Sequence, residues 1–128
     1  LLLCDDTSAN LGRLDYASLS QQTLMELLVQ GFTVKVHEII PDMKHMDDTS
    51  MWHGLTTDEA GAIHTINWPY GQLQGSLALK WVPATVLSVV FAINRLSGTV
   101  DLTVLPNIMQ FLNISSNKFS ACQMENRL

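Results

Sequence analysis

Two consecutive stretches of the chain have nearly the same pattern: residues 73–95 read LQGSLALKWVPATVLSVVFAINR, and residues 96–118 read LSGTVDLTVLPNIMQFLNISSNK. Aligned without a gap, both begin with leucine and have glycine third, leucine seventh, proline eleventh and asparagine twenty-second. The asparagines, Asn94 and Asn117, are therefore 23 residues apart. A fixed period of this size indicates that one structural unit is repeated and that adjacent units bury each other's apolar faces.

The apolar residues keep the same offsets from each asparagine. They are Val86, Val89, Phe91 and Leu96 in one copy and Met109, Leu112, Ile114 and Phe119 in the next. The same frame extends one copy further toward the N-terminus, where Gly71 takes the place of the asparagine. The alternation before each asparagine is typical of a half-buried strand, which predicts inward-pointing Val89 and Leu112 in adjacent strands.

The resulting pattern, L-x-x-L-x-L-x-x-N-x-L, resembles the leucine-rich repeat family over about residues 52–128. Residues 51–68, MWHGLTTDEAGAIHTINW, are similar to the segment that leads into the first strand of plant-type members, although the usual cysteines are missing. The stretch LSGTVDLTVLP is similar to repeats of kinetoplastid members. The resemblance implies an α/β solenoid with short parallel strands on a concave face and a ladder of asparagines, Asn94 and Asn117.

The two halves of the chain differ in pattern. Residues 1–50 are expected to form an N-terminal helical cap, in which SQQTLMELLVQG, residues 20–31, is a helix that begins at Ser20 or Ser18 and ends at Gly31. The following FTVKVHEII alternates and is expected to be a strand or an extended arm. Residues 51–128 are expected to hold two to three repeats, and the fading of the frame after Phe119 indicates either a closing turn or a truncated array.

Composition excludes several classes of function. The net charge is −5 and the seven lysines and arginines are scattered, so no patch for nucleic-acid phosphates is expected. No run of 18 apolar residues is present, so no membrane span is predicted. The two cysteines favour a reducing compartment, whereas the opening LLLC would also suit the remnant of a signal peptide, so the localisation is left open.

No catalytic residues, metal ligands or cofactor are predicted, because no nucleophile or phosphate-binding motif occurs in the chain. One alternative is a metal-dependent enzyme that uses the histidine-rich stretch HEIIPDMKHMDDTSMWH, residues 37–53. Its candidate ligands are His37, His45, Asp47, Asp48 and His53. This alternative is disfavoured because the histidines lack the close spacing of a zinc site.

The function implied by the resemblance is non-catalytic recognition of a protein or peptide through the concave face. Its outward positions are Thr65, Asn67, Ser88, Val90, Ala92, Phe111, Asn113 and Ser115. Phe111 and Val90 are the apolar anchors of this set, unless other parts of the protein cover Phe111. The alternative is a structural cap of a longer array. Self-association through the open C-terminal edge, residues 109–128, is a further expectation.

Overall fold

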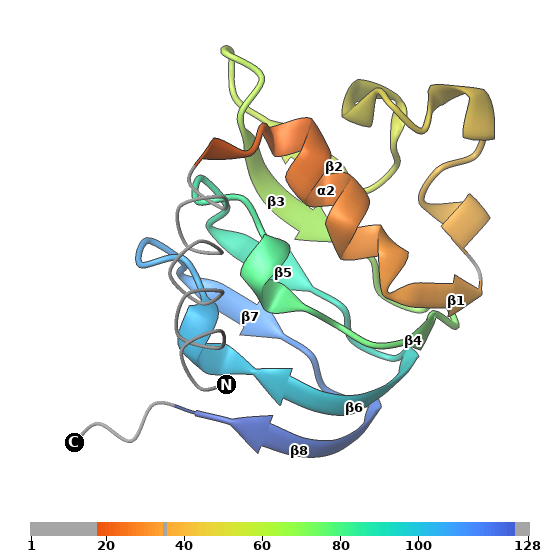
Figure 1. The fold of residues 1–128 in the computed structure, drawn as a ribbon, viewed down its shortest axis with the longest axis vertical. Helices are drawn as coiled ribbons and strands as arrows, with labels where there is room; N and C mark the ends of the chain where they lie inside the picture. Colours follow the sequence, from red (N-terminus) through yellow and green to blue (C-terminus); the bar gives the residue numbers. More distant parts are fainter. Residues whose placement is uncertain (1–17, 35, 125–128) are drawn as a thin grey trace, which may run out of the picture.

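The computed structural model describes residues 18–34 and 36–124 (Figure 1). In this part of the chain one α-helix, α2 (Gln21–Gln30), packs against two four-stranded sheets. Sheet 1 contains, in spatial order, β2 (Leu55–Thr57), β3 (Ile63–Asn67), β5 (Ser88–Val90) and β7 (Phe111–Asn113). Sheet 2 contains β1 (Phe32–Val34), β4 (Gln74–Gly75), β6 (Arg95–Asp101) and β8 (Lys118–Gln123). The connections include the short 3-10 helices η1 (Val36–Glu38), η2 (Met43–His45), η3 (Thr49–Met51), η4 (Leu79–Trp81) and η5 (Leu102–Val104).

Helix α2 confirms the prediction made from residues 20–31. Ser20 is its N-cap, and the Ser20 hydroxyl accepts a hydrogen bond from the backbone N–H of Thr23 at 3.1 Å. The helix buries Leu24, Met25, Leu28 and Val29 against the sheets. Gly31 ends it, and a side chain there would place its Cβ 2.5 Å from the Ser76 carbonyl oxygen. Only glycine allows this close approach to the segment that follows β4.

The sequence period appears in the strand pairing. In sheet 1, β3, β5 and β7 are parallel, with Ile66 opposite Val89 and Val89 opposite Leu112. In sheet 2, β4, β6 and β8 are likewise parallel. Figure 1 shows the two sets of strands descending side by side, β3 to β7 next to β4 to β8.

The predicted leucine-rich repeat solenoid with a parallel sheet is nevertheless wrong. Both sheets are mixed, because β2 pairs antiparallel with β3, and β1 pairs antiparallel with β4. The described residues form two small mixed sheets and a single α-helix, and no solenoid is present. The physical reason is that β2 and β1 lie outside the repeated sequence. Strand β2 forms a hairpin with β3, and β1, which follows α2, pairs with β4, so each sheet begins with an antiparallel strand.

The core lies between the two sheets and α2. The inward side chains of the second copy, among them Val89, Phe91 and Leu96, have no exposed surface. Phe32, which follows α2, meets Trp68 and Phe91 edge to face, with ring centroids 6.3 and 6.1 Å away. These aromatic contacts join the N-terminal segment to the repeated strands in one hydrophobic cluster.

The Asn94 side chain fastens the turn that follows the strands of sheet 1. Its Oδ1 accepts hydrogen bonds from the backbone N–H groups of Gly71 and Leu73, both at 3.0 Å. Its Nδ2 donates to the carbonyl oxygens of Trp68 and Phe91 at 2.9 and 2.8 Å, and to that of Ala92 at 3.4 Å. The side chain therefore bridges the turns of two successive copies while being only 7% exposed.

Asn117 repeats this arrangement one copy later. Its Oδ1 accepts from the backbone N–H of Leu96 at 3.1 Å, and its Nδ2 donates to the carbonyl oxygens of Phe91 and Ile114, both at 3.0 Å. Unlike Asn94, it is only half-buried. Water therefore reaches some of the groups that this side chain bonds.

The residue before Gly71, before Asn94 and before Asn117 has a left-handed backbone in each case. Tyr70, Ile93 and Ser116 have φ values of 54°, 61° and 57°. Ile93 is the most strained of the three, because a β-branched side chain is unfavourable at positive φ. The same backbone geometry is thus imposed on three different residue types, which shows that the turn and not the residue determines it.

Replacing Asn94 with alanine is expected to lower the free energy of unfolding by about 3 kcal/mol, because the N–H groups of Gly71 and Leu73 and the carbonyl of Trp68 lose the hydrogen bonds that Asn94 makes to them. Asn117→Ala is the matched control and should cost less, about 1 kcal/mol, because water can replace its bonds. Urea denaturation of both variants measures the difference. Equal losses would show that burial of the Asn94 bonds does not govern this turn.

Ile93→Asn is expected to raise the free energy of unfolding by about 0.5–1 kcal/mol, because asparagine adopts the left-handed conformation more readily. The isoleucine is 44% exposed, so little burial is lost. Ile108→Asn removes a similarly exposed isoleucine from a residue without positive φ and should give no gain. A stabilisation of the same size in both variants would contradict the explanation by backbone strain.

Candidate functional site

The outer face of sheet 1, defined by the residues of β3, β5 and β7 that alternate with the core residues, is the candidate site. Its first row contains Thr65, Ser88 and Phe111, which are direct partners across the three strands. Its second row contains Asn67, Val90 and Asn113 in the same register. Neighbouring strands lie about 4.8 Å apart, so each row forms a continuous strip of side chains.

Exposure differs strongly among the predicted site residues. Phe111 is 53% exposed, and Asn67 and Ser115 are also exposed. Thr65, Ser88, Val90 and Asn113 are half-buried. Ala92 lies beyond the end of β5, is 6% exposed and offers almost no surface to a partner.

Two exposed apolar residues beside this face were not predicted. Tyr70 is 71% exposed and Ile93 is 44% exposed. The Tyr70 N–H donates to the Ala92 carbonyl at 3.1 Å, and the Ile93 N–H donates to the Ser115 carbonyl at 3.0 Å. Tyr70 directly precedes Gly71, and Ile93 directly precedes Asn94. This shared position in the repeat was the sequence signal that could have identified both as exposed residues.

The side chain of Asn113 is hydrogen-bonded to Ser115, two residues further along the chain. Its Oδ1 accepts from the Ser115 N–H at 3.1 Å and from the Ser115 hydroxyl at 2.7 Å. The turn formed by these bonds fixes the Asn113 side chain at the end of the second row. The surface around Phe111 is therefore composed of short, ordered polar groups.

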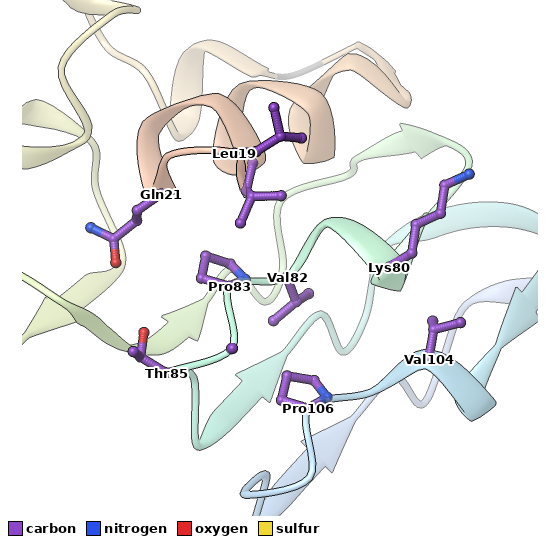
Figure 2. A pocket seen from close by; sticks show the side chains of 10 residues that line it. Leu19, Gln21, Lys80, Val82, Pro83, Thr85, Val104 and Pro106 are labelled. Carbon is purple, nitrogen blue, oxygen red and sulfur yellow. The ribbon is translucent and has the colours of Figure 1, made fainter. Parts of the chain in front are cut away.

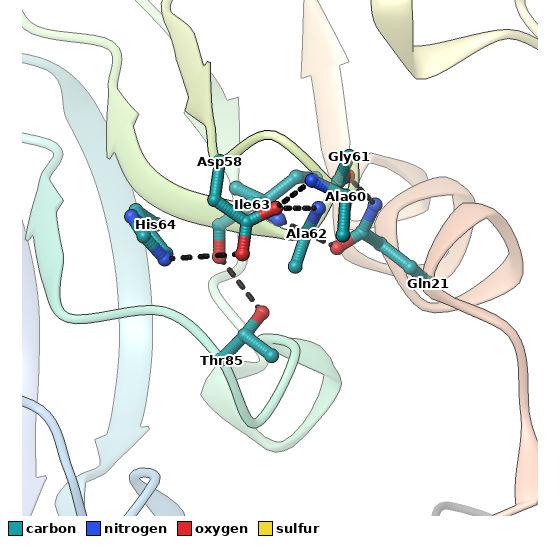
Figure 3. A network of polar contacts seen from close by, with 8 residues as sticks. All are labelled: Gln21, Asp58, Ala60, Gly61, Ala62, Ile63, His64 and Thr85. Atoms are coloured by element: carbon teal, nitrogen blue, oxygen red, sulfur yellow. Dashed lines mark hydrogen bonds and ion pairs between the residues drawn. The ribbon is translucent and has the colours of Figure 1, made fainter.

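A polar network fixes the opposite end of β3 (Figure 3). Asp58 accepts hydrogen bonds from the N–H groups of Ala62 and Ala60 at 2.9 and 2.8 Å. The Ala62 N–H is the main cause that lowers the pKa of Asp58, and His64, 3.6 Å away, also lowers it. Gln21 of α2 donates to the Gly61 carbonyl at 2.9 Å and accepts from the Ile63 N–H at 2.7 Å. These bonds join the β2–β3 turn to helix α2.

A cavity of about 480 Å³ lies between the start of α2 and the segments that precede β5 and β7 (Figure 2). Its walls are mainly apolar, with Leu19, Val82, Pro83 and Pro106 around it. Within residues 18–34 and 36–124, Lys80 is the only charged residue in its lining, and no residue of the outer face reaches it.

The histidine-rich stretch does not assemble a metal site within the described residues, where no group of three potential ligands comes together. Asp48 caps η3, accepting from the Ser50 hydroxyl at 2.6 Å, and this bond is the main cause that lowers the pKa of Asp48. His45 lies 3.9 Å from Asp42, and both are exposed. The side chain of His37 lies outside the described part of the structure, as does Cys4, whereas Cys122 is a free, exposed cysteine on β8.

None of the helices in the described residues has both the length and the apolar character needed to cross a membrane. Comparison of the chain with protein-family models, with curated proteins and with solved structures gives no match. The resemblance to the leucine-rich repeat family therefore stays a prediction based on the two sequence copies.

Proposed function

We propose that this protein binds another protein or a peptide through the outer face of sheet 1 and does not catalyse a reaction. The observation that supports the proposal is the 53% exposure of Phe111 on β7, in register with Ser88 and Thr65. Large aromatic side chains on fixed backbones are the typical anchors of protein interfaces. Tyr70 and Ile93 extend the apolar surface beyond the ends of the strands.

The surroundings of Phe111 favour binding energetically. Its backbone is held in a sheet, so little conformational entropy is lost when a partner covers it. Burial of an aromatic side chain removes about 150–250 Å² from water. The half-buried side chains of Ser88, Val90 and Asn113 form a low border that a partner can cover while excluding water from the ring.

The charge of the chain favours a partner with basic groups. With a net charge of −5, the protein attracts positively charged surfaces, which increases the rate of association at low ionic strength. The outer face itself is uncharged in its two rows. We infer that the partner contributes an apolar centre opposite Phe111 and basic residues around it.

Phe111→Asp is expected to weaken partner binding by about 30-fold or more, which is the loss typical of an interface anchor. Incorporation of a photoreactive benzoylphenylalanine at position 111 identifies the partner by cross-linking in cells that produce the protein. Affinity for the purified partner is then measured by calorimetry, and circular dichroism should be unchanged because Phe111 is exposed. Ile108→Asp, which alters a residue of similar exposure outside the two rows, is the control. Unaltered affinity of Phe111→Asp would remove Phe111 from the interface.

A second candidate is a structural role in which the C-terminal end of the sheets associates with a second copy. The observation that favours it is the burial of equivalent residues: Val89 and Phe91 have no exposed surface, whereas Leu112 and Ile114 are only half-buried. Residues 102–124 contain a single charged residue, Lys118. No described strand pairs with the outer side of β7 or β8, so this apolar end has no cover within the described residues.

Light scattering over a range of protein concentrations tests the structural role. Self-association should raise the mean mass as concentration rises, because burying a large apolar side chain contributes about 1.5–3 kcal/mol. Leu112→Lys should shift the mass toward the monomer, whereas Met51→Lys should not, because the exposed Met51 precedes β2 at the opposite edge of sheet 1. A constant monomer mass at millimolar concentration would contradict the structural role and leave the outer-face proposal unaffected.

A further inference from the structure

A second, smaller cavity of about 120 Å³ opens beside the outer face of sheet 1. It lies where η1, the segment before β2 and the end of β3 meet. Six of its lining residues matter here: Glu38, His53, Gly54, Asn67, Trp68 and Gly71. Asn67 also belongs to the second row of the outer face, so the cavity and that face share a border.

Two glycines create the space. Gly71 stands where the next two copies have Asn94 and Asn117, so the side chain that fills this turn elsewhere is missing. A Cβ at Gly71 would lie 3.2 Å from Asn94 Oδ1 and 3.9 Å from Glu38 Oε2. Gly54 has φ +80°, and a Cβ there would lie 2.6 Å from Trp68 Cδ1. Any side chain at either position would enter the space next to the Glu38 carboxylate or collide with the indole.

The wall formed by Trp68 is rigid. Its Nε1 donates to the His53 carbonyl at 2.7 Å, and its ring packs edge to face against Phe91 with centroids 5.6 Å apart. The His53 N–H in turn donates to the Ile39 carbonyl at 2.8 Å. The cavity is thus preformed, and a ligand can enter it without rearrangement of the aromatic wall.

The carboxylate of Glu38, an exposed residue, is the acidic group of this cavity among the described residues. Among the described residues it has no ion pair and no side-chain hydrogen bond. Among the residues that the structure describes, no lysine or arginine lines the cavity. A carboxylate beside an indole and a small apolar space complements a cation that has a short alkyl chain.

We propose that this cavity binds a primary ammonium group, presented by the partner of the outer face as a lysine side chain or as an N-terminal amine. The volume suits the last few heavy atoms of such a group, since a water molecule occupies about 30 Å³. The ammonium would donate to the Glu38 carboxylate while its methylene groups contact Trp68 and the glycines. This inference rests on the proposed function, because Asn67 places the cavity within the same footprint as Phe111.

Titration with n-butylammonium, followed by amide NMR, tests the cavity without any partner. The amide signals of Gly54 and Gly71 and the indole signal of Trp68 should shift together. Neutral n-butanol, the matched uncharged probe, should shift them at least about tenfold more weakly, because it lacks the charge that Glu38 attracts. Absence of shifts with butylammonium, or equal shifts with butanol, would overturn the proposal.

Glu38→Gln removes the charge while keeping the shape, and binding of butylammonium should weaken about tenfold or more. Glu59→Gln makes the same change in net charge at an exposed residue outside the cavity and should bind as the original chain does. If both variants lose affinity equally, the general negative charge and not the cavity attracts the amine, and the proposal fails.

Two further arms separate the sources of the amine and the two proposals. Nα-acetyl-lysine methylamide presents only a side-chain amine, and glycyl-glycinamide presents only an N-terminal amine; the one that shifts the Trp68 indole identifies the source.

Butylammonium should still bind Phe111→Asp, because Phe111 does not line the cavity. Loss of partner binding in Phe111→Asp but not in Glu38→Gln would retain the outer face and overturn the role of the cavity.

Discussion

The buried amide of Asn94 is the group on which the arrangement of the strands depends. Its five hydrogen bonds satisfy backbone donors and acceptors of two successive copies, in a place that water does not reach. A shift of either copy by one residue would break this set and leave several buried polar groups unpaired. The turn therefore fixes the register, and the register determines which side chains share a face. The bonds of Asn94 hold Ser88 beside Thr65, and the equivalent bonds of Asn117 hold Phe111 beside Ser88 in the next copy.

The same turn explains why apolar residues are exposed next to the outer face. The chain must pass through a left-handed residue before each turn position, and a side chain in that conformation projects away from the core. Tyr70 and Ile93 are exposed for this reason. Their exposure costs stability and leaves a ridge beside the strands, which is the kind of surface that a partner can cover.

The sequence predicted the repeated strands and the capped helix, and it missed the strands that lie outside the repeat. The 23-residue offset identified the pairing of Val89 with Leu112, and the cap residues located α2. The antiparallel strands β1 and β2 lie outside the repeated pattern, so nothing in the period revealed that both sheets are mixed. The alternation gave no signal that Ala92 would be only 6% exposed. The bonds of Gln21 to residues about 40 positions away have no local signal at all.

The first copy departs from the pattern because it has Gly71 in place of the asparagine, and this departure opens the small cavity beside the outer face. In the later copies the asparagine fills its turn, whereas Gly71 leaves the first turn open toward Glu38. Asn94 still reaches back to satisfy the N–H of Gly71, so the first copy keeps its register without a side chain of its own. Because the register is secured from the neighbouring turn, residue 71 is released from its structural role. The space that results lies beside the exposed Glu38 carboxylate and the Trp68 indole, so the cavity that we propose as an ammonium site borders the proposed binding face.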